Sequence, residues 1–318
     1  MKHPEVKTIG IVGMGMIGDN LSVLTTGHGY KTICVVRRPE MVSAYKEAYH
    51  GHFAQLAAQG LVPEGQGAIC ERYLSFADGP GALKGCEIIF ECVQEDLGLK
   101  HEIYAGLEEC CPDVLAICSV SSSFTPDMLA EKSGVLKGRI IVTHPYNPVH
   151  MVPFVEICGG ADTDTGVLLL AKEVLESMGR KPVILKKPAP GFIGNRLQFA
   201  LWREALSLVE SGVCDPRDVD ECLRYGWCPR YTSIGIFEHF DNGGLLLNKA
   251  TCDTVFPTLS NADRAPSSIT DRIAAGDTGQ RAESGKGFYD WNGVDMEAYR
   301  ERVDAPYLRF VDWDLPED

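Results

Sequence analysis

The sequence has few basic residues, no closely spaced cysteine pair of the kind that binds zinc, and no long apolar run. Lysine and arginine total 30 against 44 aspartate and glutamate residues, so the net charge is −14. This balance argues against a protein that acts mainly on nucleic acid or on an anionic membrane. No stretch of 18 apolar residues occurs, so no membrane-spanning helix is expected.

Twelve cysteines are present, but none of them forms a C-x-x-C pair. Most lie in apolar segments such as TICVV, IFECV and LAICSV, where cysteine packs as a small hydrophobic residue. We therefore expect reduced thiols, with neither a disulfide framework nor a metal site. The apolar stretch at 9–18 is closely preceded by Glu5 and Lys7 and followed by no A-x-A cleavage site, so a cytoplasmic location is expected.

Short β-branched segments alternate with helical ones through the first part of the chain. Strands are expected at 8–13, 31–36, 87–93, 114–118, 139–143 and 152–157, and helices at 17–28, within 37–68 and at 97–110. This alternation is typical of a doubly wound, mostly parallel α/β sheet. The breaker-rich KKPAPG segment follows, and helical periodicity dominates after it. The sequence therefore predicts an α/β domain over residues 1–187 and an all-helical domain over residues 188–318.

A glycine-rich motif, GMGMIG at residues 13–18, joins the first expected strand to the first expected helix and fits G-x-G-x-x-G. The first glycine permits a tight turn, the second lets the backbone approach a pyrophosphate, and the third lets the helix pack on the strand. Free N–H groups at the helix N-terminus favour the anion. We expect a Rossmann-type dinucleotide site built by Gly13, Gly15, Met16, Ile17 and Gly18.

The acid that usually binds the ribose 2′-hydroxyl of NAD is missing. It is expected about 20 residues beyond the motif, where this chain has Val36 followed by Arg37 and Arg38. Guanidinium groups pair bidentately with a phosphate dianion. The sequence therefore favours NADP as the cofactor, and NAD is the alternative if the two arginines are merely solvated.

His144 and Glu156 are the leading catalytic candidates. The THPYNP segment that contains His144 ends an expected strand, at the sheet edge where such sheets bind ligands, and Glu156 stands in the otherwise apolar VPFVEI. If the chain folds back after Pro148, the two side chains come side by side. A carboxylate would then hold the imidazole as an oriented base.

These segments resemble the 3-hydroxyacyl-CoA dehydrogenase superfamily. The motifs that carry the resemblance are ECVQEDLGLK, SVSSS, HPYNP with PFVE, GFIGNR and GKGFY, in the family's order over nearly the whole chain. The most similar branch is that of lambda-crystallin and L-gulonate 3-dehydrogenase, through PYNPVHMVPFVE, GFIGNRLQFALWREALSLVESGV and PRYTSIG. Members of that branch, and the related carnitine dehydrogenases, oxidise free 3-hydroxy acids.

The resemblance implies catalytic roles. His144 would be the general base, Glu156 would hold its imidazole, and Ser122 and Asn195 would bond the substrate oxygen and stabilise developing charge. From the residues alone, Ser122 lies in a serine-rich turn, and Asn195 could be a solvated residue on a helix. The helical domain is implied to form a homodimer.

Three further residues have binding roles in this interpretation. The resemblance places Glu95 and Lys100 near the nicotinamide ribose, although by spacing alone they could be an exposed charge pair. Arg230 is our candidate for binding a substrate carboxylate, because a planar guanidinium matches a carboxylate bidentately. Its alternative is a surface arginine after a proline.

The predicted function is hydride transfer between a nicotinamide cofactor and a small free 3-hydroxy acid, gulonate- or carnitine-like. A CoA thioester carries phosphates, yet residues 39–70 contain a single lysine, Lys46, and no arginine. A short-chain 3-hydroxyacyl-CoA dehydrogenase and a non-catalytic, crystallin-like protein are the alternatives. Val120 and Ile236 depart from the family pattern, and Ile236 weakens any assignment to gulonate itself.

Overall fold

The computed structural model describes residues 3–313 and 315–316, and they form two compact units. The first unit takes the described residues up to Ile193 together with those from Arg300 onward. The second unit is Gly194–Tyr299.

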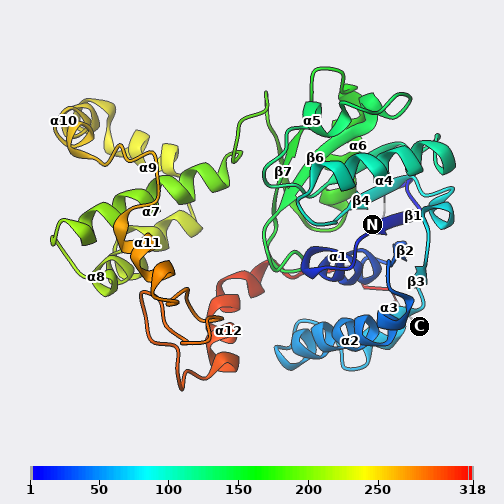
Figure 1. The fold of residues 1–318 in the computed structure, drawn as a ribbon, viewed down its shortest axis with the longest axis horizontal. Helices are drawn as coiled ribbons and strands as arrows, with labels where there is room; N and C mark the ends of the chain where they lie inside the picture. Colours follow the sequence, from blue (N-terminus) through cyan, green and yellow to red (C-terminus); the bar gives the residue numbers. More distant parts are fainter. Residues whose placement is uncertain (1–2, 314, 317–318) are drawn as a thin grey trace. The chain divides into compact units, whose positions relative to one another are not determined.

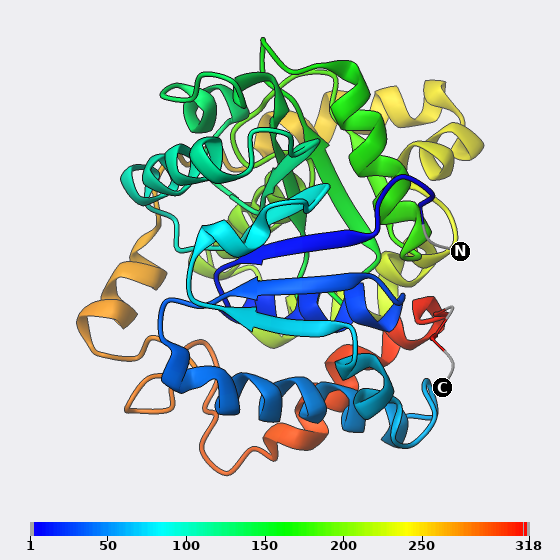
Figure 2. The same cartoon turned by 90° about the vertical axis from the view of Figure 1, so that its right-hand side faces the viewer.

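The first unit is built on one eight-stranded sheet with the order β3-β2-β1-β4-β5-β6-β7-β8 (Figures 1 and 2). The strands are β1 Thr8–Val12, β2 Lys31–Val35, β3 Leu74–Ala77, β4 Ile88–Glu91, β5 Ala116–Ser119, β6 Ile140–Pro145, β7 Phe154–Cys158 and β8 Lys181–Ile184. All neighbouring strands pair in parallel except β6 and β7. The predicted doubly wound, mostly parallel sheet is confirmed.

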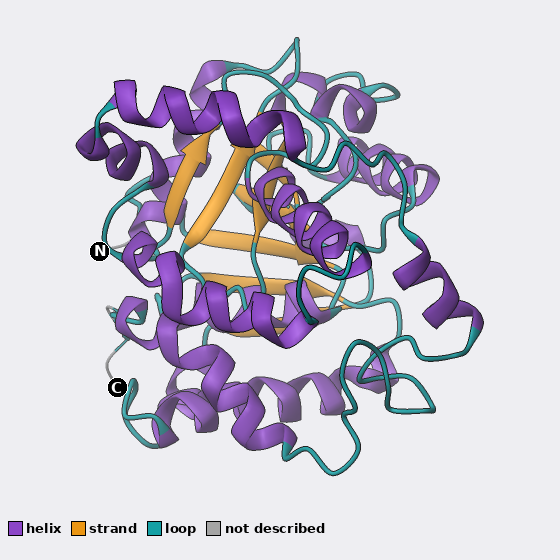
Figure 3. Cartoon of the chain, turned by 90° about the vertical axis from the view of Figure 1, so that its left-hand side faces the viewer, coloured by secondary structure: helices purple, strands orange, loops and turns teal. Residues whose placement is uncertain are grey.

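Helices cover both faces of this sheet (Figure 3). Their bounds are α1 Met16–Gly27, α2 Val42–Ala58, α3 Gln66–Glu71, α4 Leu97–Cys110, α5 Pro126–Ala130 and α6 Thr165–Ser177. Because successive strand residues point to opposite faces, the core falls into separate clusters. Ile88 and Phe90 pack with α1 and α6 on one face, whereas Ile89 packs with α4 and α5 on the other.

Two strands, β3 and β8, and two helices, α5 and α6, of this unit lie outside the sequence prediction. The strands β3 and β8 form the two edges of the sheet, have four residues each, and are half-buried or exposed at most positions. They therefore lack the continuous apolar run that marks the buried central strands. The helix α6 follows the antiparallel β7 and carries the chain to β8.

The C-terminal segment packs with the first unit, although the sequence interpretation assigned it to the helical domain. Tyr307, Leu308 and Trp313 pack against the cluster that contains Tyr49 and Phe53. The Trp313 ring lies 6.3 Å from the ring of Phe53 and directly over α1, where a Cβ on Gly27 would approach it to 2.9 Å. Burial of these large apolar groups, rather than their order in the sequence, decides where the segment lies.

The second unit is helical throughout its regular structure. Its helices are α7 Gly194–Glu210, α8 Pro216–Glu221, α9 Ile236–Gly243, α10 Leu245–Val255 and α11 Ser267–Ala274, and α12 Met296–Asp304 begins there. A π-helical turn, Cys222–Trp227, extends α8. The all-helical character predicted for this part of the chain is confirmed. Among the described residues, no helix is both long and apolar enough to cross a membrane.

Candidate functional site

His144 and Glu156 face each other across the antiparallel β6–β7 pair. The strands fold back so that the two residues are direct partners in the register, and His144 Nδ1 lies 2.8 Å from Glu156 Oε2. Both side chains are buried, and Glu156 is fully so. The predicted pairing is confirmed, and it leaves Nε2 as the ring atom that can exchange a proton with a ligand.

The Glu156 carboxylate is itself held in place by further donors. Tyr146 Oη donates to Oε2 at 3.3 Å, and the Ile193 backbone N–H donates to Oε1 at 2.6 Å. The rings of Tyr146 and Phe192 lie 5.1 and 5.4 Å from that of His144. A carboxylate fixed in this way can stabilise an imidazolium formed at His144 without moving.

The three glycines of the 13–18 motif have the geometry that their predicted roles need. Gly13 has φ +97°, and a Cβ there would lie 2.9 Å from the Cys92 carbonyl oxygen. A Cβ on Gly18 would collide with the Gly13 carbonyl oxygen, so this glycine allows α1 to pack close to β1. A Cβ on Gly15 would meet no atom within 4 Å, so the backbone there faces open space that a pyrophosphate can fill. Met16 is exposed and Ile17 half-buried beside it.

Arg37 and Arg38 lie just beyond β2, after Val36, and both are exposed, whereas Val36 is buried. Neither guanidinium forms an ion pair within the described part of the chain. They stand at the carboxyl end of β2, which is the same edge of the sheet as the glycine motif. Their charges are therefore available to an anionic group of a ligand at that edge.

The serine turn, residues 119–123, begins at the last residue of β5 and is held by Glu95. Glu95 Oε1 accepts hydrogen bonds from Ser121 Oγ at 2.5 Å and from the backbone N–H of Ser122 at 2.9 Å and Ser123 at 2.9 Å. Partial burial alone would raise the pKa of Glu95, but these bonds and the nearby Lys100 ammonium outweigh it, and the pKa is lowered. Ser122 itself is exposed, so its hydroxyl is accessible to a ligand.

Lys100 is not part of an exposed charge pair, although its spacing from Glu95 in the sequence alone allowed one. Its side chain is fully buried, and Nζ lies 3.5 Å from Glu95 Oε2 and 2.8 Å from Glu91 Oε1. Glu91 was not singled out in the sequence, although a carboxylate within the apolar EIIFECV run was a signal of a buried polar role.

Asn195 and Arg230 belong to the second unit. Asn195 is half-buried in the first turn of α7, and Arg230 is exposed in the middle of the short 3-10 helix Cys228–Thr232, which follows the π-helical segment. Arg230 Nη1 lies 3.4 Å from His239 Nε2. The structure thus brings His144, Glu156 and the serine turn to one edge of the sheet in the first unit.

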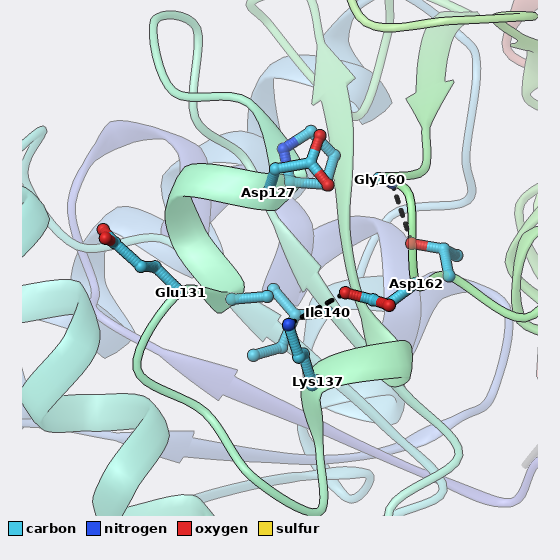
Figure 4. A pocket seen from close by; sticks show the side chains of 9 residues that line it. Asp127, Glu131, Lys137, Ile140, Gly160 and Asp162 are labelled. Carbon is cyan, nitrogen blue, oxygen red and sulfur yellow. Dashed lines mark hydrogen bonds and ion pairs between the residues drawn. The ribbon is translucent and has the colours of Figure 1, made fainter.

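A small polar pocket lies at the other end of β6 (Figure 4). It is lined by Asp127, Lys137, Ile140 and Asp162 among others, and the Lys137 ammonium pairs with the Asp162 carboxylate at 2.9 Å. Since Ile140 begins β6 and His144 lies near its end, this pocket is separate from the candidate site.

Comparison with known families assigns both parts of the chain. The family model described as "3-hydroxyacyl-CoA dehydrogenase, NAD binding domain" matches residues 8–188, and that described as "3-hydroxyacyl-CoA dehydrogenase, C-terminal domain" matches residues 191–291. Together they cover most of the sequence.

Relatives named as dehydrogenases match most of this chain. L-carnitine dehydrogenase of Pseudomonas aeruginosa is 34% identical over 234 residues, which are 73% of this chain and 71% of the relative. The 5-formyl-3-hydroxy-2-methylpyridine 4-carboxylate 5-dehydrogenase of Mesorhizobium japonicum is 27% identical over 285 residues, 89% of this chain and 90% of the relative.

Solved structures agree with the fold. A 5-formyl-3-hydroxy-2-methylpyridine 4-carboxylic acid 5-dehydrogenase, described as an NAD+ dependent dismutase, superposes with a TM-score of 0.85 at 25% identity, covering 96% of this chain and 97% of that one. The 3-hydroxybutyryl-CoA dehydrogenase of Escherichia coli K12 gives a TM-score of 0.75 at 24% identity, covering 91% of this chain and 60% of that one.

Proposed function

Because this chain belongs to the 3-hydroxyacyl-CoA dehydrogenase family, we propose that it transfers a hydride between a nicotinamide cofactor and the 3-hydroxyl (3-keto) carbon of a small free 3-hydroxy acid. The observation that carries the proposal is the buried His144–Glu156 pair, with Nδ1 and Oε2 2.8 Å apart. It stands at the sheet edge where parallel α/β folds bind their ligands.

In this proposal His144 Nε2 takes the hydroxyl proton of the substrate as its C–H bond breaks and the carbonyl forms. Glu156 stabilises the imidazolium that results, and Ser122 and Asn195 bond the substrate oxygen while its charge develops. The bound nicotinamide supplies the acceptor for the hydride. The open space over Gly15 and the glycine-rich turn fit such a dinucleotide.

The proposed substrate is a free acid rather than a CoA thioester. The one lysine of 39–70, Lys46, is paired with Glu71 at 2.7 Å, and His50 also contacts that carboxylate at 2.9 Å. No unpaired lysine or arginine is then left in this segment for the phosphates of CoA. Arg230 is the proposed partner of the substrate carboxylate, and the relatives named L-carnitine dehydrogenase are in keeping with a free acid.

A matrix of cofactors and substrates tests this function. NAD(H) and NADP(H) should be combined with carnitine, gulonate, 3-hydroxybutyrate and its CoA ester. We expect kcat/KM for one free acid to exceed that for the CoA ester at least tenfold. A faster reaction of the CoA ester would establish the thioester alternative, and inactivity of both wild type and His144→Ala across the matrix would favour the crystallin-like alternative.

The cofactor proposed here is NADP, because Arg37 and Arg38 stand where an NAD-specific site has its acid. NAD is the competing candidate, and it is the cofactor named for both the matching family model and the solved relative. Substitution of the two arginines distinguishes these cofactors, since only NADP carries a 2′-phosphate for them to bind.

The second unit exposes many large apolar side chains, among them Leu197, Phe199, Trp202, Phe237 and Leu246. Exposed apolar area of this kind is typical of a protein interface, and we propose that it is covered in a homodimer. A monomeric sedimentation coefficient at micromolar concentration would contradict this.

The free thiols fit a cytoplasmic location, which subcellular fractionation can test.

A further inference from the structure

Glu91, the last residue of β4, carries a completely buried carboxylate that receives hydrogen bonds from four residues. Lys100 Nζ donates to Oε1 and Oε2 at 2.8 and 3.0 Å, and the Val93 N–H donates to Oε1 at 2.9 Å. Tyr104 Oη and Ser119 Oγ both donate to Oε2 at 2.7 Å. The negative charge is therefore fully compensated, as burial at this depth requires.

Two chains of contacts lead from this carboxylate to the serine turn. The first runs through Ser119, whose hydroxyl donates to Glu91 and accepts from the Ser121 N–H at 3.4 Å. The second runs through Lys100, whose ammonium lies 3.5 Å from Glu95 Oε2. Glu95 then holds the turn by accepting hydrogen bonds from the Ser121 hydroxyl and from the backbone N–H groups of Ser122 and Ser123.

Stability alone gives little reason to keep this charge pair. A buried ion pair is often no more stabilising than apolar side chains of the same volume, because both ions lose their hydration. What the network contributes instead is a fixed geometry, since a buried ionic network in which every hydrogen bond is made allows only one arrangement of its side chains. Here the network ends on the backbone N–H of Ser122, at the carboxyl edge of the sheet.

We propose that Glu91 is a positioning residue that fixes the serine turn, and through it the Ser122 hydroxyl, for the substrate oxygen. This inference rests on the proposed function, in which Ser122 bonds that oxygen. Reacting groups must be held within a fraction of an ångström, and a small misplacement from a distant change costs on the order of a hundredfold in rate.

A double-mutant cycle with Glu91→Gln and Ser122→Ala tests the coupling. The probes are carnitine, gulonate and 3-hydroxybutyrate with NAD+ and NADP+, and kcat is measured for the best of them. Glu91→Gln should lower kcat about 30-fold in the wild-type background but less than about threefold when Ser122 is already alanine. Equal losses in both backgrounds, or no loss at all, would overturn the inference and leave the proposed function standing.

A matched pair of variants separates positioning from general weakening and also serves if Glu91→Gln does not fold. Ser119→Ala and Tyr104→Phe each remove one 2.7 Å hydrogen bond to the same Oε2, but only Ser119 leads to the turn. Ser119→Ala should lower kcat about tenfold and Tyr104→Phe less than about twofold. Equal effects would count against Glu91 as a positioning residue.

Hydrogen–deuterium exchange gives a readout that needs no substrate. In Glu91→Gln, or in Ser119→Ala if the former does not fold, the peptide spanning 119–124 should exchange at least about tenfold faster, while α6 peptides keep their wild-type rate. Unchanged exchange at 119–124 overturns the inference. If the wild type oxidises none of the probes, the proposed function fails, and this measurement still decides whether Glu91 holds the turn.

Discussion

Replacing His144 by glutamine should lower kcat for hydroxy-acid oxidation by about a thousandfold, within the range usual for loss of a general base. Glutamine keeps a hydrogen-bonding group opposite Glu156 but cannot accept the hydroxyl proton. The loss should fall on kcat, because the dinucleotide loop at residues 13–18 joins β1 to α1 and does not include His144. Steady-state kinetics with the best substrate of the matrix measures it.

His101 provides the matched control for this variant. It is also buried in the first unit, and its Nε2 lies 2.9 Å from the Met128 carbonyl oxygen rather than near a carboxylate. His101→Gln should keep kcat within about twofold, since it changes packing but removes no proton acceptor at the site. If the two variants lose activity equally, or if His144→Gln keeps wild-type turnover, His144 is not the base.

The sequence could predict those parts of the site that depend on a short stretch of chain. The His144–Glu156 pairing needs only a reversal after Pro148, and the strand register then places the two residues opposite each other. The glycine motif is recognisable from six residues, because the contact between Gly18 and the Gly13 carbonyl and the open space at Gly15 arise within the turn itself, although Gly13 also faces the distant Cys92.

The parts that escaped prediction depend on distant partners. Lys100 lies nine residues from Glu91 and becomes buried only because β4, β5 and α4 converge on that carboxylate. Trp313 packs on α1, far earlier in the chain, and no periodicity within 300–318 reports this contact. Edge strands such as β3 also show only a weak hydrophobic pattern in the sequence, because their residues are half-buried or exposed.

Replacing Arg37 and Arg38 together by alanine should raise the KM for NADPH about 100-fold and that for NADH less than about threefold. A charge-assisted hydrogen bond contributes about 1.5–3 kcal/mol, and both side chains are exposed, so the lower value applies to each. Two such bonds amount to about 3 kcal/mol, or about two orders of magnitude. NADH lacks the 2′-phosphate and has no such bonds to lose.

Lys31→Ala is a control for the loss of a positive charge elsewhere on the same strand. Lys31 is exposed and begins β2, so it lies at the end of the strand opposite to Arg37 and Arg38. Its removal changes the net charge in the same direction but should leave both Michaelis constants within about twofold. The discrimination between NADPH and NADH by the wild type should also shrink as salt rises, because exposed charges are screened. If the double variant raises the KM for NADPH and for NADH equally, the two arginines are solvated and bind no 2′-phosphate. NAD would then bind through the glycine loop, without the usual contact between an acid and its ribose.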